Sequence, residues 1–396
     1  MLTTVMAQRS KLPAFPALHQ GGDKIRVGFV APCLVNGGAE TWQASLARSL
    51  DQRFNVVGVA VNGTMIEPSA VESYRGICPV SEGIEAVTTL ARNVDILVCW
   101  GSYDYARAWR DETVKPFLVS TCHIPPEWDE GLYRDVTDLD GFVAVSSSAL
   151  EAIPEASRSK AVVIPNAVDT GRLVASRTRD EVRASWNVST SDFVVGYLGR
   201  LSAEKNPGVM IELARTAPSV KVVLVGAGGL LDDLQAAAQD LDNVRLVGAD
   251  HRAGDVLQAF DTLIVPSNFE SYGLSLVEGL AVGVPVISTN VGVAKENPGL
   301  TRVVVEATGP ALWEALQADR SDLDGTQTRI ASGRSWVASN ATLEAFGKLW
   351  SDHLAGLPIR PRVKPKPRGC GCGKKLEVPK ELDQRRRDVI KRALGK

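Results

Sequence analysis

Short apolar runs alternate with segments of helical character along the chain from residue 24, and this alternation is the feature that most constrains the fold. The first run, "KIRVGFVAP" at residues 24–32, is rich in β-branched side chains and lacks polar alternation, as expected of a strand buried on both faces. Similar runs lie at residues 54–61, 95–100, 117–123, 141–147 and 161–166. Such strands separated by helices predict a parallel sheet covered by helices on both faces.

The alternation pauses once and then resumes. Residues 167–192 are polar and link two units, after which apolar runs return at residues 193–199, 220–228, 244–248, 262–267 and 284–289. The sequence therefore predicts an α/β fold with two doubly wound parallel-sheet units of the Rossmann type, for which 396 residues are sufficient. We assign residues 24–175 to the first unit and 190–334 to the second, and expect a last amphipathic helix at about 335–356.

The composition is typical of a protein that folds in water. The sequence is 44% hydrophobic and 23% charged. No run approaches the roughly 18 apolar residues that a membrane span needs. Residues 1–23 have no apolar core of signal-peptide length, so we interpret them as a disordered lead and expect a cytoplasmic location.

The end of the chain differs from the rest, because residues 357–396 are rich in Pro, Gly and Lys. The segment 360–396, called the basic tail below, has 14 basic and 4 acidic residues and a net charge of +10, which leaves −12 on residues 1–359. The basic tail is either a solvated extension or a contact surface for DNA, a membrane surface or an acidic protein. Cys370 and Cys372 have no second Cys or His pair nearby, so no metal site is predicted there.

Two basic side chains follow the first strand of the second unit. Arg200 and Lys205, in "GRLSAEKNPG", come at the carboxyl end of that strand, where ligands of such sheets bind. Two fixed cations suit a diphosphate, although a solvated loop could carry the same pair. The next strand ends in "VGAGG", where Gly226 would let the backbone approach a ligand, but a tight turn also needs glycine.

Two glutamates surround a glycine in "NFESYGLSLVEG" at residues 268–279. Glu270 lies in the loop after a buried strand, and Glu278 lies near the start of the following helix. The amides of Gly273 and its neighbours Leu274 and Ser275 would point into the cleft and suit a phosphate. A carboxylate at Glu278 can accept hydrogen bonds from a vicinal diol such as a ribose. These groups together match the parts of a nucleotide-sugar.

The motifs as a set resemble one family. "GRLSAEKNP", "VGAG" and "VPSNFESYGLSLVEGLAVGVPVIS", with the earlier "GGAE" and "VIPNAVD", are similar in order and spacing to retaining glycosyltransferase family four, from about residue 24 to 355. The resemblance implies the GT-B fold, in which two Rossmann-like domains face each other across a cleft. The first would be the acceptor domain and the second the nucleotide-sugar donor domain, with the last helix returning to the first.

The resemblance also implies roles for individual side chains. Arg200 and Lys205 would neutralise the donor diphosphate. Glu270 would touch the hydroxyls of the donor sugar, and Glu278 would bind the ribose. His123, at the end of a strand of the first unit, is the candidate for a contact with the transferred sugar.

Other implied donor contacts come from the main chain. The turn at Gly37 and Gly38 would approach the diphosphate from the first unit, and the amides of Gly273, Leu274 and Ser275 would hold the phosphate. Asn166 and Asp169 match a family motif, and we interpret both as structural. Two positions depart from the family pattern: Gly279 stands where alanine is usual, and Val293 where a second glycine is usual.

The implied activity is transfer of a sugar from a nucleoside-diphosphate sugar to an acceptor hydroxyl with retention of configuration. It needs no metal and no further cofactor, and a UDP-sugar is expected first and a GDP-sugar second. The acceptor stays open between a glycan, a lipid, a small molecule, a protein and modified DNA. The tail string "GCGCGKK" is similar to those of phage-encoded proteins, which would favour virion protein or modified DNA.

Two other functions are compatible with the same fold. One is a sugar-nucleotide epimerase or hydrolase, for which the sequence offers no evident acid–base residues. The other is a non-catalytic sugar-nucleotide-binding scaffold, against which the presence of Arg200, Lys205, Glu270 and Glu278 argues.

Overall fold

A computed structural model describes residues 12, 15, 23–35, 37–63, 65–100, 116–123, 139–151, 153, 155–250 and 252–359. The basic tail, with Cys370 and Cys372, lies outside these described residues, as does most of the lead. Three lead residues are described, and two of them, Leu12 and Phe15, pack against the hydrophobic core. Phe15 fits because Gly58 has no side chain, and a Cβ there would lie 2.4 Å from the Phe15 ring.

The first unit is built on a parallel sheet with the strand order β3-β2-β1-β4-β5-β6-β7. Its strands are β1 (Ile25–Ala31), β2 (Phe54–Val61), β3 (Val80–Glu82), β4 (Ile96–Trp100), β5 (Phe117–Cys122), β6 (Gly141–Ala144) and β7 (Ala161–Val163). Its helices are α1 (Gly38–Ser49), α2 (Pro68–Glu72), α3 (Ile84–Asn93), α5 (Ser147–Glu151) and α6 (Glu155–Arg158).

The second unit repeats this plan with the strand order β10-β9-β8-β11-β12-β13. Its strands are β8 (Val194–Leu198), β9 (Lys221–Val225), β10 (Val244–Gly248), β11 (Thr262–Val265), β12 (Val286–Thr289) and β13 (Arg302–Val304). Its helices are α7 (Arg179–Ser185), η3 (Ala203–Lys205), α8 (Gly208–Thr216), α9 (Leu231–Ala237), α10 (Ala253–Gln258), α11 (Leu274–Val282), α12 (Gly292–Glu296), α13 (Gly309–Ser321) and α14 (Leu323–Asn340). The short helix η2 (Thr170–Leu173) lies in the linker.

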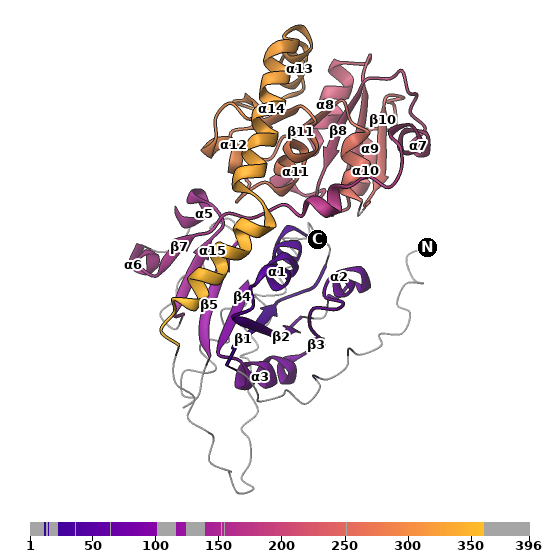
Figure 1. Ribbon diagram of the computed structural model, residues 1–396. Coiled ribbons are helices and arrows are strands. Elements are labelled where there is room, and N and C mark those ends of the chain that lie inside the picture. The colour runs from indigo at the N-terminus through magenta and orange to yellow at the C-terminus, as the bar shows by residue number, and fades with distance from the viewer. Residues whose placement is uncertain are drawn as a thin grey trace, which may run out of the picture.

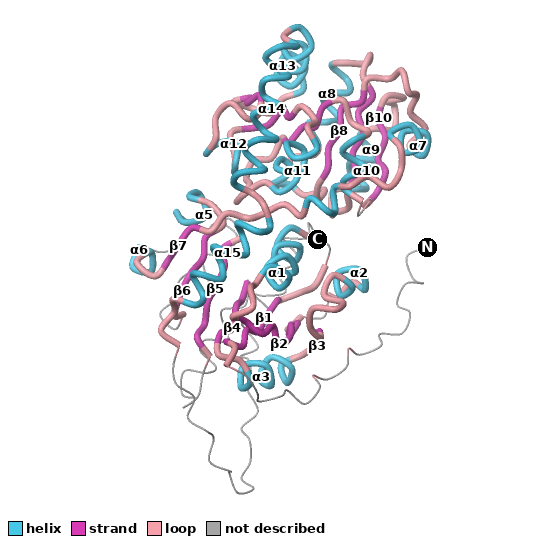
Figure 2. The backbone as a smooth tube through the Cα atoms, viewed as in Figure 1, coloured by secondary structure: helices cyan, strands magenta, loops and turns pink. Residues whose placement is uncertain are grey.

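Strand β9 shows why these strands are apolar throughout. Val222 and Leu224 face the core beneath α8 and α13, whereas Val223 and Val225 face the core beneath α10 and α11. Both faces of the sheet are therefore buried, as the run "VKVVLV" predicts. This confirms the predicted α/β fold with two Rossmann-like units, which form separate lobes in Figures 1 and 2.

The order of the strands determines where a ligand can bind. In each sheet the order reverses beside the first strand, between β1 and β4 in the first unit and between β8 and β11 in the second. In open α/β sheets the crevice at such a point, outside the carboxyl ends of the strands, is the usual binding site. The segment after β8 carries Arg200 and Lys205, and the segment after β11 carries Glu270.

The last part of the chain crosses from one unit to the other. A single helix over about 335–356 is predicted, but the structure breaks it: α14 ends at Asn340 against α11, and α15 (Leu343–Ala355) packs on α1 (Figure 1). The break forms because Thr342 caps α15 and pairs with Val168 of the linker. Helix α15 can lie close to α1 because Gly347 faces the carbonyl of Ser49. Among the described helices, none is long and apolar enough to cross a bilayer.

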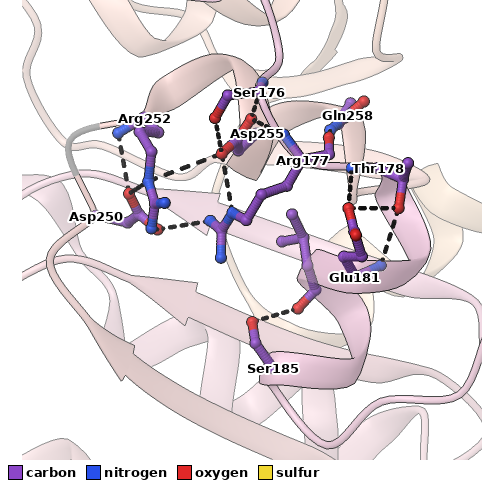
Figure 3. Close-up of polar contacts among 10 residues, drawn as sticks. Ser176, Arg177, Thr178, Glu181, Ser185, Asp250, Arg252, Asp255 and Gln258 are labelled. Carbon is purple, nitrogen blue, oxygen red and sulfur yellow. Dashed lines mark hydrogen bonds and ion pairs between the residues drawn. The ribbon is translucent and has the colours of Figure 1, made fainter.

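A polar network holds the linker against the second unit (Figure 3). Asp255 on α10 is fully buried and accepts hydrogen bonds from the backbone N–H of Ser176 at 2.6 Å and of Arg177 at 3.1 Å. Its Oδ2 also accepts from the Ser176 hydroxyl and from Arg177 Nε, both at 2.9 Å. Burial alone would raise the pKa of Asp255, but these hydrogen bonds outweigh it and hold the pKa well below its ordinary value.

Replacing Asp255 with alanine is expected to lower the free energy of unfolding by about 3 kcal/mol, because it removes the acceptor of two backbone amides and of Arg177 Nε and leaves the Arg177 guanidinium only its pair with Asp250. Chemical denaturation at pH 7 measures this loss. The control is Asp240→Ala, which breaks an exposed pair with Arg215 and should change stability little. Equal effects of the two substitutions would contradict the role given to the network.

Candidate active site

The loop after β8 is fixed in place by its neighbours. Helix η3 ends at Lys205, and Asn206 follows with φ 50°, a left-handed conformation that asparagine tolerates. The backbone N–H of Asn268, after β11, donates to the carbonyl of Glu204 at 2.8 Å. The loop that carries Arg200 and Lys205 is thereby joined to the loop that carries Glu270.

The glycine turn after β9 packs against the same loop. A Cβ at Gly226 would lie 1.8 Å from the carbonyl oxygen of Gly199, and one at Gly228 would lie 2.2 Å from that of Leu201. The close approach seen in the structure is therefore between two protein backbones, which requires glycine on its own account. A donor contact at Gly226 stays a prediction.

Lys205 and Glu270, which the sequence assigns to different parts of a donor, lie in contact. Lys205 Nζ is 2.7 Å from Glu270 Oε2, and the Ser267 hydroxyl donates to Glu270 Oε1 at 2.9 Å. Both side chains are largely buried, at 22% and 10% exposure. The Glu270 carboxylate therefore holds the lysine that is expected to face a diphosphate.

The N-terminus of α11 is open. Gly273 is its N-cap with φ 91°, no side chain caps the helix, and its first turn contains no acidic residue. The amides of Leu274 and Ser275 belong to that first turn, where a helix offers no acceptor of its own. Leu274 Cδ1 lies 3.4 Å from where a Cβ on Gly38 would be, so the N-termini of α11 and α1 meet across the two units.

Glu278 lies one turn into α11 and is half-buried. Burial raises its pKa to about 7, while the positive charge of Arg172 on η2 opposes that rise. The adjacent Gly279 explains one departure from the family pattern. A Cβ there would lie 2.6 Å from Leu263 Cδ2 on β11, so alanine at this position would require the buried Leu263 side chain to shift.

The second departure also has a structural explanation. Val293 is buried in α12, and its N–H donates to the carbonyl of Tyr272 at 2.9 Å. That amide is therefore engaged within the protein. Gly292 has φ 48°, and a Cβ on it would lie 2.3 Å from the same Tyr272 carbonyl oxygen. Glycine is therefore required at position 292 but not at position 293.

His123 lies at the end of β5 with its ring buried. The ring packs against Trp42 with a centroid distance of 4.6 Å, and its Nε2 has no hydrogen-bond partner. Burial lowers the pKa of His123 to about 3, so the imidazole is neutral at physiological pH. Its carbonyl accepts a hydrogen bond from the Ser271 hydroxyl at 2.9 Å, which connects the first unit to the residue after Glu270.

Asn166 and Asp169 have surroundings that agree with a structural interpretation. Asp169 caps η2 by accepting from the N–H of Gly171 at 3.0 Å, and it pairs with Arg48 of α1 at 3.2 Å. Asn166 is buried. In the described part of the chain, no group of three or more His, Cys, Asp or Glu side chains is placed to hold a metal ion.

One residue at the site was missed by sequence reasoning. Glu40 lies in the first turn of α1 and is 7% exposed. A Cβ added to Gly37 would lie 2.5 Å from Oε2 of Glu40, and Cys33 Sγ donates a hydrogen bond to Oε1 at 3.5 Å. Burial raises the pKa of Glu40 to about 7, while Arg200 of the second unit opposes that rise. The sequence signal that could have identified Glu40 is its place in "GGAE", where it follows the N-cap of α1, Gly37, by three residues.

Sequence comparison relates part of the chain to a known family. Residues 178–315 match the family described as glycosyl transferases group 1. The matched segment is about a third of the chain and lies mainly in the second unit. The group 1 match covers β8 to α13, and therefore includes Arg200, Lys205, Glu270 and Glu278.

Relatives and solved structures extend the comparison. The chain is 28% identical over 267 residues to D-inositol 3-phosphate glycosyltransferase of Mycolicibacterium smegmatis, covering 61% of this chain and 60% of that protein. It is 31% identical over 224 residues to the enzyme of the same name from Segniliparus rotundus, covering 51% and 49%. The chain thus spans about half the length of the curated relatives it matches.

A solved structure confirms the architecture. HepE from Anabaena, crystallised with UDP and glucose, superposes with a TM-score of 0.75 and 19% identity over 84% of this chain and all of that one. WaaG, a glycosyltransferase involved in lipopolysaccharide biosynthesis, gives a TM-score of 0.62 and 14% identity over 83% of this chain and all of that one. The predicted GT-B fold is therefore confirmed.

Proposed function

We propose that this protein transfers a sugar from a nucleoside-diphosphate sugar to an acceptor hydroxyl, with retention of anomeric configuration and without a metal ion. One observation carries the proposal: Arg200 and Lys205 follow β8, and the open N-terminus of α11 follows β11, so all three come after the carboxyl ends of two neighbouring strands. Two cations and a helix start at a strand-order reversal form a site for a diphosphate.

The positive groups have a chemical task in this proposal. When the bond between the anomeric carbon and the diphosphate breaks, negative charge develops on the leaving group. Arg200, Lys205 and the first-turn amides of α11 would stabilise that charge, so the anomeric carbon gains oxocarbenium character. The acceptor hydroxyl would enter on the face of the leaving group and pass its proton to a phosphate oxygen, which yields retention.

The remaining residues would position the donor. Glu278 would accept hydrogen bonds from the ribose hydroxyls as a carboxylate, and Glu270 would contact hydroxyls of the sugar. His123 supports the same arrangement, because a neutral ring with an unpartnered Nε2 can exchange a hydrogen bond with a sugar hydroxyl. We propose UDP first as the nucleotide of the donor, which the UDP complex of HepE supports, and GDP second.

Turnover tests this function. The purified protein is incubated with UDP-glucose, UDP-N-acetylglucosamine or GDP-mannose, and release of UDP or GDP is followed. Slow hydrolysis of one donor that disappears in Arg200→Ala supports the proposal. If no donor is bound or consumed, the glycosyltransferase function is wrong for this chain.

We also propose that the basic tail recruits the acceptor. Its net charge of +10 suits an anionic acceptor, such as modified DNA or an acidic surface, presented to a body with a charge of −12. Deleting residues 360–396 should leave donor hydrolysis unchanged and lower transfer to the acceptor about tenfold or more at low salt. An unchanged transfer rate would show that the tail plays no part in acceptor use.

A further inference from the structure

Glu40 is a buried carboxylate in the cleft to which the proposed reaction gives no task. It lies at the start of α1, where Gly37 is the N-cap and provides no side chain of its own. The Glu40 carboxylate lies over that N-cap, with Oε2 against Gly37 and Oε1 accepting from Cys33. The position at which α1 would attract an external anion is therefore already occupied by an anionic group of the protein.

The charged and titratable groups around Glu40 come from several elements. In the described part of the chain these are Cys33 from the β1–α1 loop, Glu67 and Tyr74 from the α2 region, and Arg200 from the second unit. Arg200 favours the ionised form of Glu40, whereas Glu67 disfavours it. Arg200 is also the residue expected to bind the donor diphosphate, so Glu40 and the donor would face the same cation.

The N-termini of α1 and α11 differ in whether an acidic side chain lies in the first turn. Helix α11 has no acidic residue in its first turn and no side-chain cap, whereas α1 contains Glu40 there. The helices touch through Leu274 and Gly38. A diphosphate bound at α11 and Arg200 would therefore bring its negative charge near the buried carboxylate of Glu40.

Resting on the proposed function, we propose that the buried carboxylate of Glu40 takes up a proton when a nucleoside diphosphate binds at the adjoining N-terminus of α11. Two negative charges close together in a buried site are unfavourable, and protonation of one removes the repulsion. Because burial already places the pKa of Glu40 at about 7, the proton is available near neutral pH. The neutral carboxyl can then donate a hydrogen bond to a phosphate oxygen.

The sign of the pH dependence follows. Below pH 7 Glu40 is already protonated and does not oppose UDP, whereas above pH 7 it is ionised and UDP binding must supply the proton. Glu278 also has a pKa raised to about 7 and would act in the opposite direction, because it binds ribose best when ionised. The contribution of Glu40 to the pH dependence of UDP binding is therefore measured as the difference between wild type and Glu40→Gln. Both proteins contain Glu278, so its contribution cancels.

The experiment is calorimetry of UDP and GDP binding to the full chain at pH 6 and pH 8, in buffers with different ionisation enthalpies. Glu40→Gln should bind UDP about tenfold more tightly than wild type at pH 8 and within about twofold at pH 6, and wild type should take up about three quarters of a proton more than the variant at pH 7.5. Glu72→Gln, which changes an exposed carboxylate of α2 that pairs with Arg75, serves as the matched control and should behave like wild type.

The outcomes separate this inference from the proposed function. If UDP or GDP binds but proton uptake and pH dependence are the same in wild type and Glu40→Gln, the role of Glu40 is wrong and the function stands. If neither nucleotide binds either protein, both fail. A change in melting temperature without a change in proton uptake would indicate that Glu40 is only structural.

Discussion

Replacing Arg200 with alanine is expected to lower kcat/KM for sugar transfer by about a thousandfold, the effect of removing one preorganised group that stabilises charge in a transition state. Arg200 follows β8 at the strand-order reversal and acts electrostatically on Glu40 of the opposite unit, so it lies near the junction of the two units. Steady-state kinetics with the donor identified by screening measure the loss.

A matched control tests whether the loss is specific to the site. Arg215 lies on α8, away from the cleft, in an exposed pair with Asp240. Arg215→Ala should retain wild-type kcat/KM. A loss of less than about fivefold in Arg200→Ala, or an equal loss in both variants, would contradict the role given to Arg200.

The second large effect is that substitutions of Glu278 and Glu270 should change different quantities, the affinity for UDP and kcat respectively. Glu278→Gln should weaken binding of both free UDP and the intact donor by 10-fold to 100-fold, because hydrogen bonds to a charged group are worth about 1.5–3 kcal/mol. Glu270→Gln should leave the affinity for UDP unchanged or raise it, because it releases Lys205 from the 2.7 Å ion pair, while kcat for transfer falls about 100-fold.

Calorimetry with UDP and kinetics with the donor measure the two quantities separately. Ser267→Ala is the control for Glu270, because it removes the 2.9 Å hydrogen bond to Oε1 and leaves the carboxylate in place. It should reduce kcat much less than Glu270→Gln does. If Glu270→Gln and Glu278→Gln lower UDP affinity equally, the two residues do not have the separate tasks proposed for them.

Both cations expected at the diphosphate have a carboxylate nearby. Lys205 pairs with Glu270 at 2.7 Å, and Arg200 is close enough to Glu40 to favour its ionised form. On the proposed function, a bound diphosphate would compete with these carboxylates for the two cations.

Much of the fold could be predicted from the sequence because the strands are buried on both faces. The run "VKVVLV", for example, has no polar residue after Lys221. Only a strand in a sheet that is covered on both faces requires such a run of apolar residues. The strands β3 and β13 were not predicted. Each has only three residues and lies at a sheet edge, where partial exposure weakens the apolar signal.

The helix break near Ala341 was also not predicted. Its cause is the pairing of Thr342 with Val168, more than 170 positions earlier in the chain, and local sequence carries little trace of such a contact. The candidate site shows the same limit. The motifs placed Glu270 and Glu278 on the correct loop and helix, but the contact of Lys205 with Glu270 and the position of Glu40 opposite Arg200 depend on how the loops and units pack.

The most direct test of the central claim is thermal unfolding with UDP, GDP and ADP, for wild type and for Glu278→Gln. A true ligand stabilises the folded protein in proportion to the logarithm of its concentration above its dissociation constant. We predict that one of UDP and GDP raises the melting temperature of wild type progressively with concentration, and that the shift is largely lost in Glu278→Gln. A wild-type protein that none of the three nucleotides stabilises, or a Glu278→Gln variant stabilised as fully as wild type, would contradict the account.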